Sequence, residues 1–324
     1  MNKAFHVVAD WNNWASSKTA STGHVLGCSP RRASELRTRS DLAVIIVSYN
    51  TCRLLRNCLC ALEASSGIQP SVWVVDNASQ DGSTEMVRTE FPAVHLVEPG
   101  HNLGFAAANN LALRQMGFGS AAPSAHLPEF VLFLNPDTEV RTDALARLRA
   151  FLQTTPRAGV VGPALIYPDG SFQHSAFRFP TLWQVWFDLV PWPGRFVESP
   201  LNGRYPRALY TSGQPFRIDH PLGAAFMTRA QVIQQVGLMD EGFFMYAEEI
   251  DWCMRVKRAG WEIYCLPSAV VMHYAGGSTR QQLASMNEVL WRSRFRLFEK
   301  HYGKPFAWAA RLLFHLAARQ QAVP

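Results

Sequence analysis

Leu42-Ala43-Val44-Ile45-Ile46-Val47-Ser48 is an almost uninterrupted apolar run that ends at the polar pair Tyr49-Asn50. A parallel strand that is buried on both faces has this pattern, without the alternation of a half-exposed strand. Three further apolar runs follow at 72–75, 94–97 and 130–134, separated by stretches typical of helices. This alternation predicts a Rossmann-like α/β fold, in which helices cover both faces of a mostly parallel sheet.

The second half of the chain is less regular. Residues 172–219 are rich in Pro, Trp, Phe and Arg, which predicts either a long loop or a small subdomain. Strand-like sequence resumes at 220–227, and we expect helices at 230–236 and 247–259. Residues 261–272 predict a strand and its return.

Composition limits the class of protein without naming it. The chain has 324 residues, 48% of them hydrophobic, so it can bury a full core without disulfides. Its formal net charge of +6 suits a polyanion such as nucleic acid, anionic lipid or a diphosphate. Six cysteines without a CxxC pair favour reduced thiols. Because no apolar run reaches about 18 residues and no signal peptide is evident, we expect a cytoplasmic protein.

Polar residues follow three of the predicted strands: Tyr49-Asn50, Asp76-Asn77 and Asn135-Pro136-Asp137. In open α/β sheets, ligands bind at the carboxyl ends of the strands, so the three clusters point to one crevice. The Asp76 carboxylate could accept hydrogen bonds from a nucleobase imide or a ribose hydroxyl. The small residues after Asn102 and the free amides of the helix that starts near Gly104 suit a phosphate group; alternatively, they only pack that helix on the sheet.

Asp137 is the clearest single indication of a metal-binding residue in the sequence. A carboxylate at a strand end can hold Mg²⁺ or Mn²⁺ against a diphosphate, because such ions take few protein ligands and complete their shells with phosphate and water. Glu139 could supply a second carboxylate. The alternative is that Asp137 only caps the helix that begins near Thr142-Asp143.

Three carboxylates, Glu248, Glu249 and Asp251, open the helix expected at 247–259. Acidic residues stabilise the first turn of a helix, but three exceed what capping needs. Glu248 and Asp251 share a helix face, whereas Glu249 points elsewhere. One of them could act as a general base while the others orient it. The aromatic residues at 243–246 would desolvate the base and raise its pKa.

Seven short motifs follow one another between residue 42 and about residue 278: Val47-Ser48-Tyr49-Asn50, Asp76-Asn77-Ala78-Ser79, Asn102-Leu103-Gly104-Phe105, Leu134-Asn135-Pro136-Asp137, Leu222-Gly223-Ala224-Ala225, Gly237-Leu238-Met239-Asp240 and the stretch from Phe243 to Cys253. Each motif is weak alone, but their joint order is specific. In this order the chain resembles the family 2 glycosyltransferases, above all the bacterial rhamnosyltransferase-like branch.

The resemblance implies a GT-A fold and inversion at the anomeric carbon. It implies that Glu249 is the catalytic base, at a position where the family usually has Asp, with Asp251 as the second candidate and Glu248 as an orienting group. It places Asp137 at the metal-binding motif, with Mg²⁺ or Mn²⁺ as cofactor and His273 near the metal or diphosphate. The donor-binding candidates are Ser48, Tyr49, Asn50, Asp76, Asn77, Asn102, Gly104, Asn109 and Asn135.

The function implied is transfer of a sugar from a nucleoside diphosphate to a glycan or polyprenyl-linked acceptor, in cell-wall or polysaccharide biosynthesis. The first choice of donor is dTDP-rhamnose and the second is a UDP-hexose. A catalytically silent nucleotide-sugar binding protein is the alternative of another class. Nucleic-acid binding and nicotinamide chemistry are disfavoured, because no nucleic-acid-binding signature and no GxGxxG after a strand occurs.

We expect three parts in the chain. Residues 1–40 form a flexible extension, residues 41–280 form the transferase domain, and residues 281–324 form a basic amphipathic helical tail. Within the domain, 41–140 is the nucleotide-sugar half and 141–280 the acceptor and catalytic half. The aromatic and basic tail suits peripheral contact with the inner face of the cell membrane, or else packing on the domain or on the partner in a homodimer.

Overall fold

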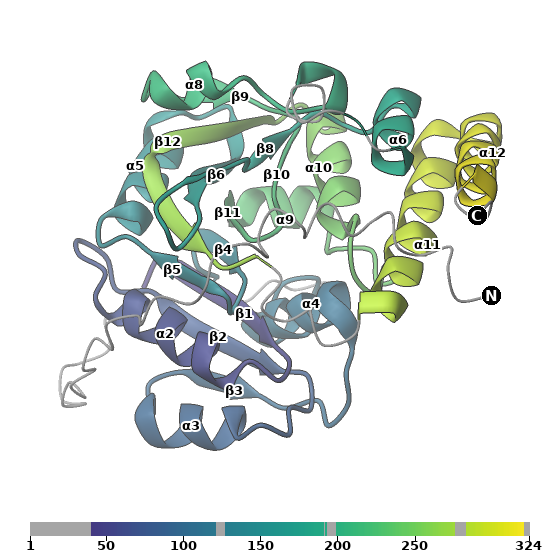
Figure 1. Ribbon diagram of the computed structural model, residues 1–324. Coiled ribbons are helices and arrows are strands. Elements are labelled where there is room, and N and C mark those ends of the chain that lie inside the picture. The colour runs from purple at the N-terminus through teal and green to yellow at the C-terminus, as the bar shows by residue number, and fades with distance from the viewer. Residues whose placement is uncertain (1–39, 121–126, 191, 193–198, 276–282, 321–324) are drawn as a thin grey trace.

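The computed structural model describes residues 40–120, 127–190, 192, 199–275 and 283–320 (Figure 1). The extension predicted at 1–40 lies outside these residues, apart from Ser40. Among the residues described, no helix combines the length and apolarity that a bilayer crossing requires.

A ten-stranded sheet forms the centre of the fold. Its spatial order is β3 (His95–Val97), β2 (Ser71–Asp76), β1 (Leu42–Ser48), β4 (Phe130–Leu134), β11 (Ala225–Arg229), β6 (Ala158–Ile166), β12 (Glu262–His273) and β5 (Thr138–Val140), with β7 (Phe172–Gln173) beside β6 and β9 (Phe216–Arg217) beside β12. Strands β3, β2, β1 and β4 run parallel, and β11 is antiparallel to both of its neighbours. All seven residues of β1 are buried, as its unbroken apolar run predicted.

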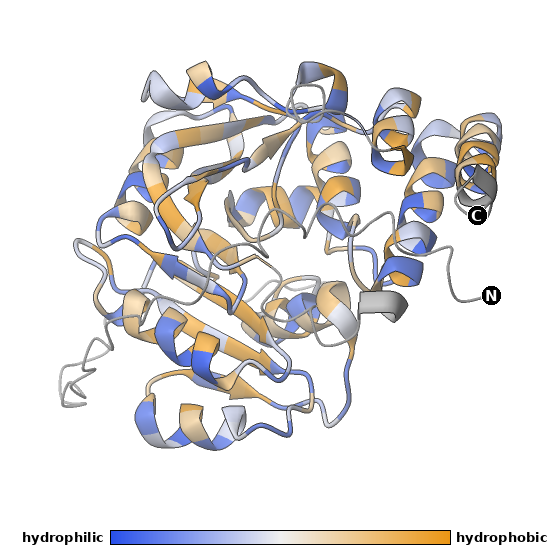
Figure 2. Ribbon diagram, in the orientation of Figure 1, coloured by the Kyte–Doolittle hydropathy of each residue, from blue (hydrophilic) through white to orange (hydrophobic). Residues whose placement is uncertain are grey.

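Helices cover both faces of this sheet. One face carries α2 (Cys52–Glu63), α3 (Ser83–Glu90) and α5 (Ala144–Thr154), and the other carries α4 (Gly104–Met116), α9 (Ala230–Val236) and α10 (Glu248–Arg258). Alternate residues of β1 enter the two cores, with Val44 and Ile46 on one side and Ile45 on the other. In Figure 2 the central strands are largely hydrophobic between these helices. The predicted α/β class with helices on both faces is confirmed.

The second half differs from the prediction in one strand. Residues 262–273 form the single long strand β12, with a register shift between Leu266 and Val270, so the predicted return is wrong. The described residues between 172 and 219 contain short elements instead of one long loop: β7 and β9 of the main sheet, β8 (Ala176–Phe177), α6 (Leu182–Leu189), the 3₁₀ turn η2 (Pro200–Asn202) and α8 (Arg207–Thr211). Strand β8 pairs with β10 (His220–Pro221) in a separate two-stranded sheet.

The tail forms a helical hairpin of α11 (Leu283–Tyr302) and α12 (Lys304–Gln320), which packs on α6 and α10. Trp291, Leu297 and Phe298 of α11 are buried in this third apolar cluster. The packing alternative therefore accounts for the aromatic residues of α11, whereas part of α12 remains exposed.

Candidate active site

The carboxyl ends of β1 and β2 lie side by side, with Ser48 opposite Asp76. Asp76 is buried, and its Oδ2 atom accepts a hydrogen bond of 2.8 Å from the backbone N–H of Ser79. Its Oδ1 atom is also buried but has no hydrogen-bond partner within the protein. A buried carboxylate oxygen without a partner is costly, so Oδ1 is suited to accept a hydrogen bond from a ligand.

The other polar residues around Asp76 shape the loops. Asn50 adopts a left-handed backbone (φ 52°), its N–H donates to Ser79 Oγ (2.8 Å), and its Oδ1 accepts from the N–H of Gln80 (2.8 Å). Ser48 Oγ lies 2.9 Å from Thr51 Oγ1. These bonds hold the loops after β1 and β2 together, while Tyr49 between them is partly exposed.

The start of α4 is tied to the loop before α10. Asn77 Nδ2 donates to the carbonyl of Gly104 (3.2 Å), and the N–H of Gly104 donates to Asn102 Oδ1 (2.9 Å). Gly104 has φ 78°, and a Cβ there would overlap the carbonyl of Phe244, which accepts from the N–H of Phe105 (2.7 Å). Protein groups therefore occupy these first amides of α4, contrary to the expectation of free amides for phosphate.

Asn109 also has an internal partner. It is buried, and its Nδ2 donates to the carbonyl of Phe105 one turn earlier in the same helix (2.9 Å). The neighbouring Asn110 bonds both the N–H (3.0 Å) and the carbonyl (2.8 Å) of Met239. Both amides thus stabilise α4 and its contacts within the protein.

Asp137 and His273 come together although they are far apart in sequence. Strand β5 pairs with β12 so that Thr138 lies opposite His273, and the N–H of Tyr274 donates to the carbonyl of Asp137 (2.9 Å). Both side chains are buried, and His273 Nε2 lies 3.5 Å from Asp137 Oδ1. On the other side of the ring, Nδ1 lies 3.1 Å from Gln173 Oε1. Because an amide oxygen only accepts, Gln173 fixes the tautomer with hydrogen on Nδ1 and leaves the Nε2 lone pair beside Asp137.

This pair of side chains fits a hard divalent cation. One buried carboxylate and one oriented imidazole are few ligands, which suits an ion that takes its remaining ligands from phosphate and water. The described residues hold no group of three or more His, Cys, Asp or Glu side chains arranged to bind a metal without such help. The carboxylate of Glu139 instead accepts hydrogen bonds from Tyr274 Oη (2.7 Å) and Asn57 Nδ2 (3.3 Å).

Glu249 approaches the same end of the sheet from α10. Its side chain packs against Gly223, where a Cβ would be 3.5 Å from Glu249 Cδ. The next residue, Ala224, accepts a hydrogen bond of 2.8 Å from the N–H of Asn135. A single turn between β10 and β11 therefore contacts both Glu249 and the Asn135-Pro136-Asp137 segment.

Glu248 is buried and Glu249 is partly buried. Each has a buried carboxylate oxygen without a hydrogen-bond partner in the protein. Burial raises the pKa of Glu249 to about 7, against the lowering influence of the N–H groups of Glu249 and Ile250 and of the Arg294 guanidinium on α11. Burial and the adjacent Glu249 raise the pKa of Glu248 well above its usual value. Both carboxyls of the pair thus have raised pKa values, and that of Glu249 lies close to neutral pH.

A family model for glycosyl transferase family 2 matches residues 43–189. An N-acetylglucosaminyl-diphospho-decaprenol L-rhamnosyltransferase of Mycobacterium tuberculosis is 31% identical to the chain over 288 residues, which are 86% of this chain and 93% of that protein. The chain belongs to glycosyltransferase family 2. It is an enzyme that transfers a sugar, as the order of its motifs predicted.

Solved glycosyltransferases share the fold of this family 2 enzyme. The mannosyltransferase PcManGT from Pyrobaculum calidifontis, in complex with GDP-Man and Mn²⁺, aligns with 98% of this chain and 81% of its own at 17% identity and a TM-score of 0.55. GalNAc-T7 with UDP, GalNAc and Mn²⁺ aligns with 81% of this chain and 48% of its own at 15% identity and a TM-score of 0.56. The predicted GT-A fold is confirmed.

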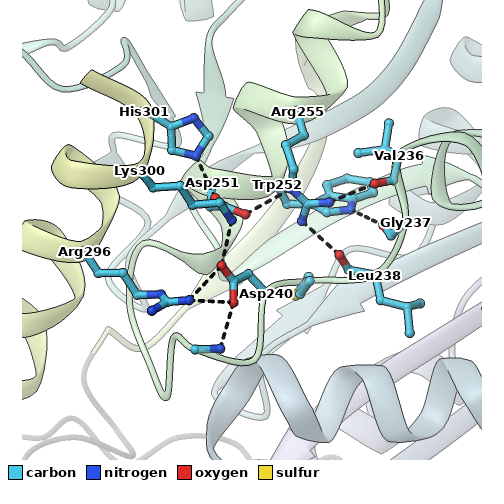
Figure 3. A network of polar contacts seen from close by, with 12 residues as sticks. Val236, Gly237, Leu238, Asp240, Asp251, Trp252, Arg255, Arg296, Lys300 and His301 are labelled. Carbon is cyan, nitrogen blue, oxygen red and sulfur yellow. Dashed lines mark hydrogen bonds and ion pairs between the residues drawn. The ribbon is translucent and has the colours of Figure 1, made fainter. Parts of the chain in front are cut away.

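In this glycosyltransferase, Asp251 points toward Lys300 and His301 of α11 (Figure 3). Its Oδ1 lies 2.6 Å from both Lys300 Nζ and His301 Nε2, and its Oδ2 lies 3.0 Å from Arg255 Nε. Burial alone would raise the pKa of Asp251, but the hydrogen bonds from Lys300 and His301 lower it below its usual value. This fully buried carboxylate, bound by the two cations Lys300 and Arg255 and by the His301 ring, holds α10 against α11, and both of its oxygens are engaged by these partners.

A second carboxylate extends this network. Asp240 contacts Arg296 (3.1 Å) and Lys300 (2.6 Å), and although its partial burial opposes the change, these cations lower its pKa to about 2. Arg255 also donates to the carbonyls of Val236 and Leu238 (both 2.9 Å), which fixes the Gly237-Leu238-Met239-Asp240 turn (Figure 3). The motif around Asp240 thus has a structural explanation.

Three residues of the site had no predicted role: Gln173, Gly223 and Arg294. Gln173 lies in the irregular segment, and only the pairing of β7 with β6 and of β12 with β5 brings it to His273. Arg294 belongs to the tail and forms an ion pair of 2.9 Å with Asp188 of α6. The motif Leu222-Gly223-Ala224-Ala225 was recognised by resemblance alone, which gave no reason for its glycine.

Proposed function

We propose that this glycosyltransferase transfers L-rhamnose from dTDP-rhamnose, with inversion, to a polyprenyl-diphosphate-linked GlcNAc acceptor of cell-wall or polysaccharide biosynthesis. The Mycobacterium tuberculosis relative, named as an L-rhamnosyltransferase of N-acetylglucosaminyl-diphospho-decaprenol, supports the sugar and the acceptor because the chain covers 93% of it. The observation that carries the proposed reaction is Glu249: a carboxylate with a pKa of about 7 in contact with the turn that binds the Asn135-Pro136-Asp137 segment.

In the proposed reaction, Glu249 accepts the proton of the acceptor hydroxyl as that oxygen attacks the anomeric carbon. The bond from the anomeric carbon to the diphosphate oxygen breaks in the same step, and the nucleoside diphosphate leaves from the opposite face of the sugar. A general base works best with a pKa near the operating pH, which burial provides for Glu249. Glu248, the adjacent carboxyl on α10, would orient Glu249.

Asp137 and His273 would hold the divalent cation, Mg²⁺ or Mn²⁺, with Gln173 orienting the imidazole. When bound, such a cation neutralises the negative charge that develops on the leaving diphosphate. The residues after β1 and β2 would form the nucleoside site, with Asp76 Oδ1 accepting the imide N–H of thymine or uracil. Ser48, Asn50, Asn77 and Asn102 would act by fixing the loops of this nucleotide-sugar half, and Tyr49 and Asn135 by direct contact with the donor.

A screen of sugar nucleotides tests this function. Purified enzyme is incubated with short-chain prenyl-diphosphate-linked GlcNAc and, in separate reactions, dTDP-L-rhamnose, UDP-glucose, UDP-galactose, UDP-GlcNAc and GDP-mannose. We expect rhamnosylated product alone, with the anomeric configuration opposite to that of the donor by NMR. Transfer from a UDP-hexose alone would show that the donor is a UDP-hexose and not dTDP-rhamnose. Binding without turnover of any donor would indicate a silent binding protein.

The first prediction concerns Asp76. Asp76→Ala should weaken the binding of dTDP and UDP about 10–100-fold by calorimetry, because it removes a charge-assisted hydrogen bond, and should slow turnover at saturating donor much less. The control is Asp81→Ala in the next turn, where Asp81 accepts from the N–H of Cys52 (2.7 Å) and supports only the loop. Equal losses of nucleotide affinity in the two variants, or tight binding of GDP-sugars alone, would contradict the role of Asp76 in binding the base.

The second prediction concerns pH. Protonated Glu249 cannot accept a proton, so kcat/KM should fall about tenfold per pH unit below the pKa of about 7 that burial gives this carboxylate. The acidic limb should be measured across about two pH units on either side of that value. In Glu249→Gln the same limb should disappear from the residual activity. A parental profile that stays flat at pH values well below 7 would refute the role of Glu249.

A further inference from the structure

Four of the exposed large apolar side chains lie on two helices that pack together, α12 and α6. Among the described residues there are seven: Trp183, Trp192, Leu201, Phe244, Trp308, Leu312 and Leu316. Three of them lie on α12, and Trp183, the most exposed at 69%, lies on α6, against which α12 packs. Monomeric proteins scatter such residues singly, so this concentration indicates an interaction surface.

Helix α12 has two distinct faces. Its inner face packs on α11 and α6 through the buried residues Ala307, Ala310 and Ala317. Trp308, Leu312 and Leu316 are spaced by four residues, so they form a single stripe on the outside, and they are 66%, 43% and 45% exposed. Hydrophobic turns run along the length of α12 in Figure 2. The hairpin is thus already anchored by its inner face, and the outer stripe is not needed for its packing.

The charges on α12 have one sign. Its sequence contains Lys304, Arg311 and Arg319 and no Asp or Glu. Lys304 and Arg311 are exposed beside the apolar stripe, as is His315. Over residues 283–320, seven Lys or Arg residues stand against two Glu residues, an excess of five in a chain whose formal net charge is +6. Tryptophan and leucine flanked by Lys and Arg are the composition of helices that lie in an anionic membrane interface.

We propose that the outer stripe of α12, Trp308, Leu312 and Leu316, docks the enzyme on an anionic phospholipid bilayer, with Trp183 of α6 beside it. The stripe enters the interface while Lys304 and Arg311 contact lipid phosphates. This inference rests on the proposed function, because a polyprenyl-linked acceptor lies in the membrane. It also differs from the prediction for the whole tail, since Trp291, Leu297 and Phe298 of α11 are buried inside the protein.

A second copy of the chain fits this surface less well. Contact between two identical stripes would bring the cations of both α12 helices together, and like charges across an interface disfavour association. The centres of protein interfaces are also depleted of charged residues, whereas here cations flank the stripe along the helix. An anionic lipid surface complements both features at once.

Vesicle sedimentation tests the docking surface. The full chain is sedimented with phosphatidylcholine vesicles and with vesicles containing about one-third phosphatidylglycerol. The variant carries Trp308→Gln, Leu312→Gln and Leu316→Gln, which preserve helix propensity on an exposed face, and the matched control carries Leu201→Gln on η2, where Leu201 is 60% exposed. Thermal unfolding verifies that each variant folds as the parent does.

We expect the parent and the Leu201→Gln control to bind anionic vesicles strongly and neutral ones weakly, and the triple variant to lose at least about tenfold in partition coefficient. Equal partitioning of parent and triple variant, or no preference for anionic vesicles, would overturn the proposal. So would a dimer in analytical ultracentrifugation that the triple variant dissociates without any change in vesicle binding.

Transfer assays separate this proposal from the proposed function. The triple variant should use a water-soluble short-chain prenyl-diphosphate-linked GlcNAc at the parental rate, but lose most transfer to the long-chain acceptor embedded in vesicles. If neither protein transfers rhamnose to either acceptor while the vesicle result stands, the proposed function fails and the docking surface survives. Parental transfer to the vesicle-embedded acceptor by a variant that no longer sediments would overturn the docking proposal alone.

Discussion

Glu249→Gln should lower sugar transfer about 10²–10⁴-fold, the usual cost of removing a general base, while the affinities for nucleoside diphosphate and Mn²⁺ stay within about twofold of the parent. The substitution keeps the shape of the side chain but cannot accept a proton. It also removes a buried carboxylate whose Oε2 has no partner in the protein, so the fold should lose no stability. Transfer is measured by single-turnover kinetics and affinity by calorimetry.

Two further variants make this result specific. Glu249→Asp should keep substantial activity, because Asp is the usual residue at this position in the family that the chain resembles. Glu85→Gln on α3, where Glu85 is exposed, serves as the matched control and should behave as the parent. If Glu249→Gln transferred sugar at the parental rate while folded Asp251→Asn was inactive, Asp251 would be the base instead.

The sequence could not choose between these carboxylates, and the reason is physical. Glu248, Glu249 and Asp251 all lie in the first turn of α10, where helix periodicity separates their directions without saying what each direction faces. The choice depends on α11, more than 40 residues further along the chain, whose Lys300 and His301 bind Asp251. Gly223, from the turn between β10 and β11, lies against Glu249. Both contacts are long-range, and no local pattern contains them.

The difference between local sequence patterns and long-range contacts also explains which strands could be predicted. Strand β1 has an unbroken apolar sequence because both of its faces are buried, and this requirement is visible in the residues themselves. Strand β6 is equally central, but Gly159, Gly162 and Pro163 interrupt its apolar pattern, and no strand was expected there. Strand-end polar residues were predicted to share one crevice, and the parallel register brings two of them, Ser48 and Asp76, side by side.

The proposed metal site combines a local signal with long-range contacts. Asp137 stands directly after a recognisable strand, so its place at the edge of the sheet follows from the sequence. The resemblance implied His273 near the metal or diphosphate, but its contact with Asp137 depends on the antiparallel pairing of β5 with β12, and its tautomer depends on Gln173 from the irregular segment. A histidine near the end of a strand has many structural explanations. The orientation of its ring indicates a role in metal binding only when the groups at both ring nitrogens are known.

Asp137→Ala should lower transfer about 10³-fold, because several kcal/mol of stabilisation of the leaving diphosphate depend on a cation held at this position. The fold should survive, since the link between β5 and β12 here is made by the backbone, through the N–H of Tyr274 and the carbonyl of Asp137. The matched control is Asp143→Ala, six residues further on, where the carboxylate is exposed and bonds only Arg147 in its own helix (2.7 Å).

The measurement needs two readouts, because loss of activity alone would not identify the cause. Mn²⁺ affinity, followed by electron paramagnetic resonance in the presence of dTDP, should fall with Asp137→Ala and stay unchanged with Asp143→Ala. Chelation of the parent enzyme should abolish transfer, and added Mn²⁺ or Mg²⁺ should restore it. Full activity of the parent in excess chelator, or parental Mn²⁺ affinity in Asp137→Ala, would show that the buried pair of Asp137 and His273 stabilises the edge of the sheet rather than binding a cation.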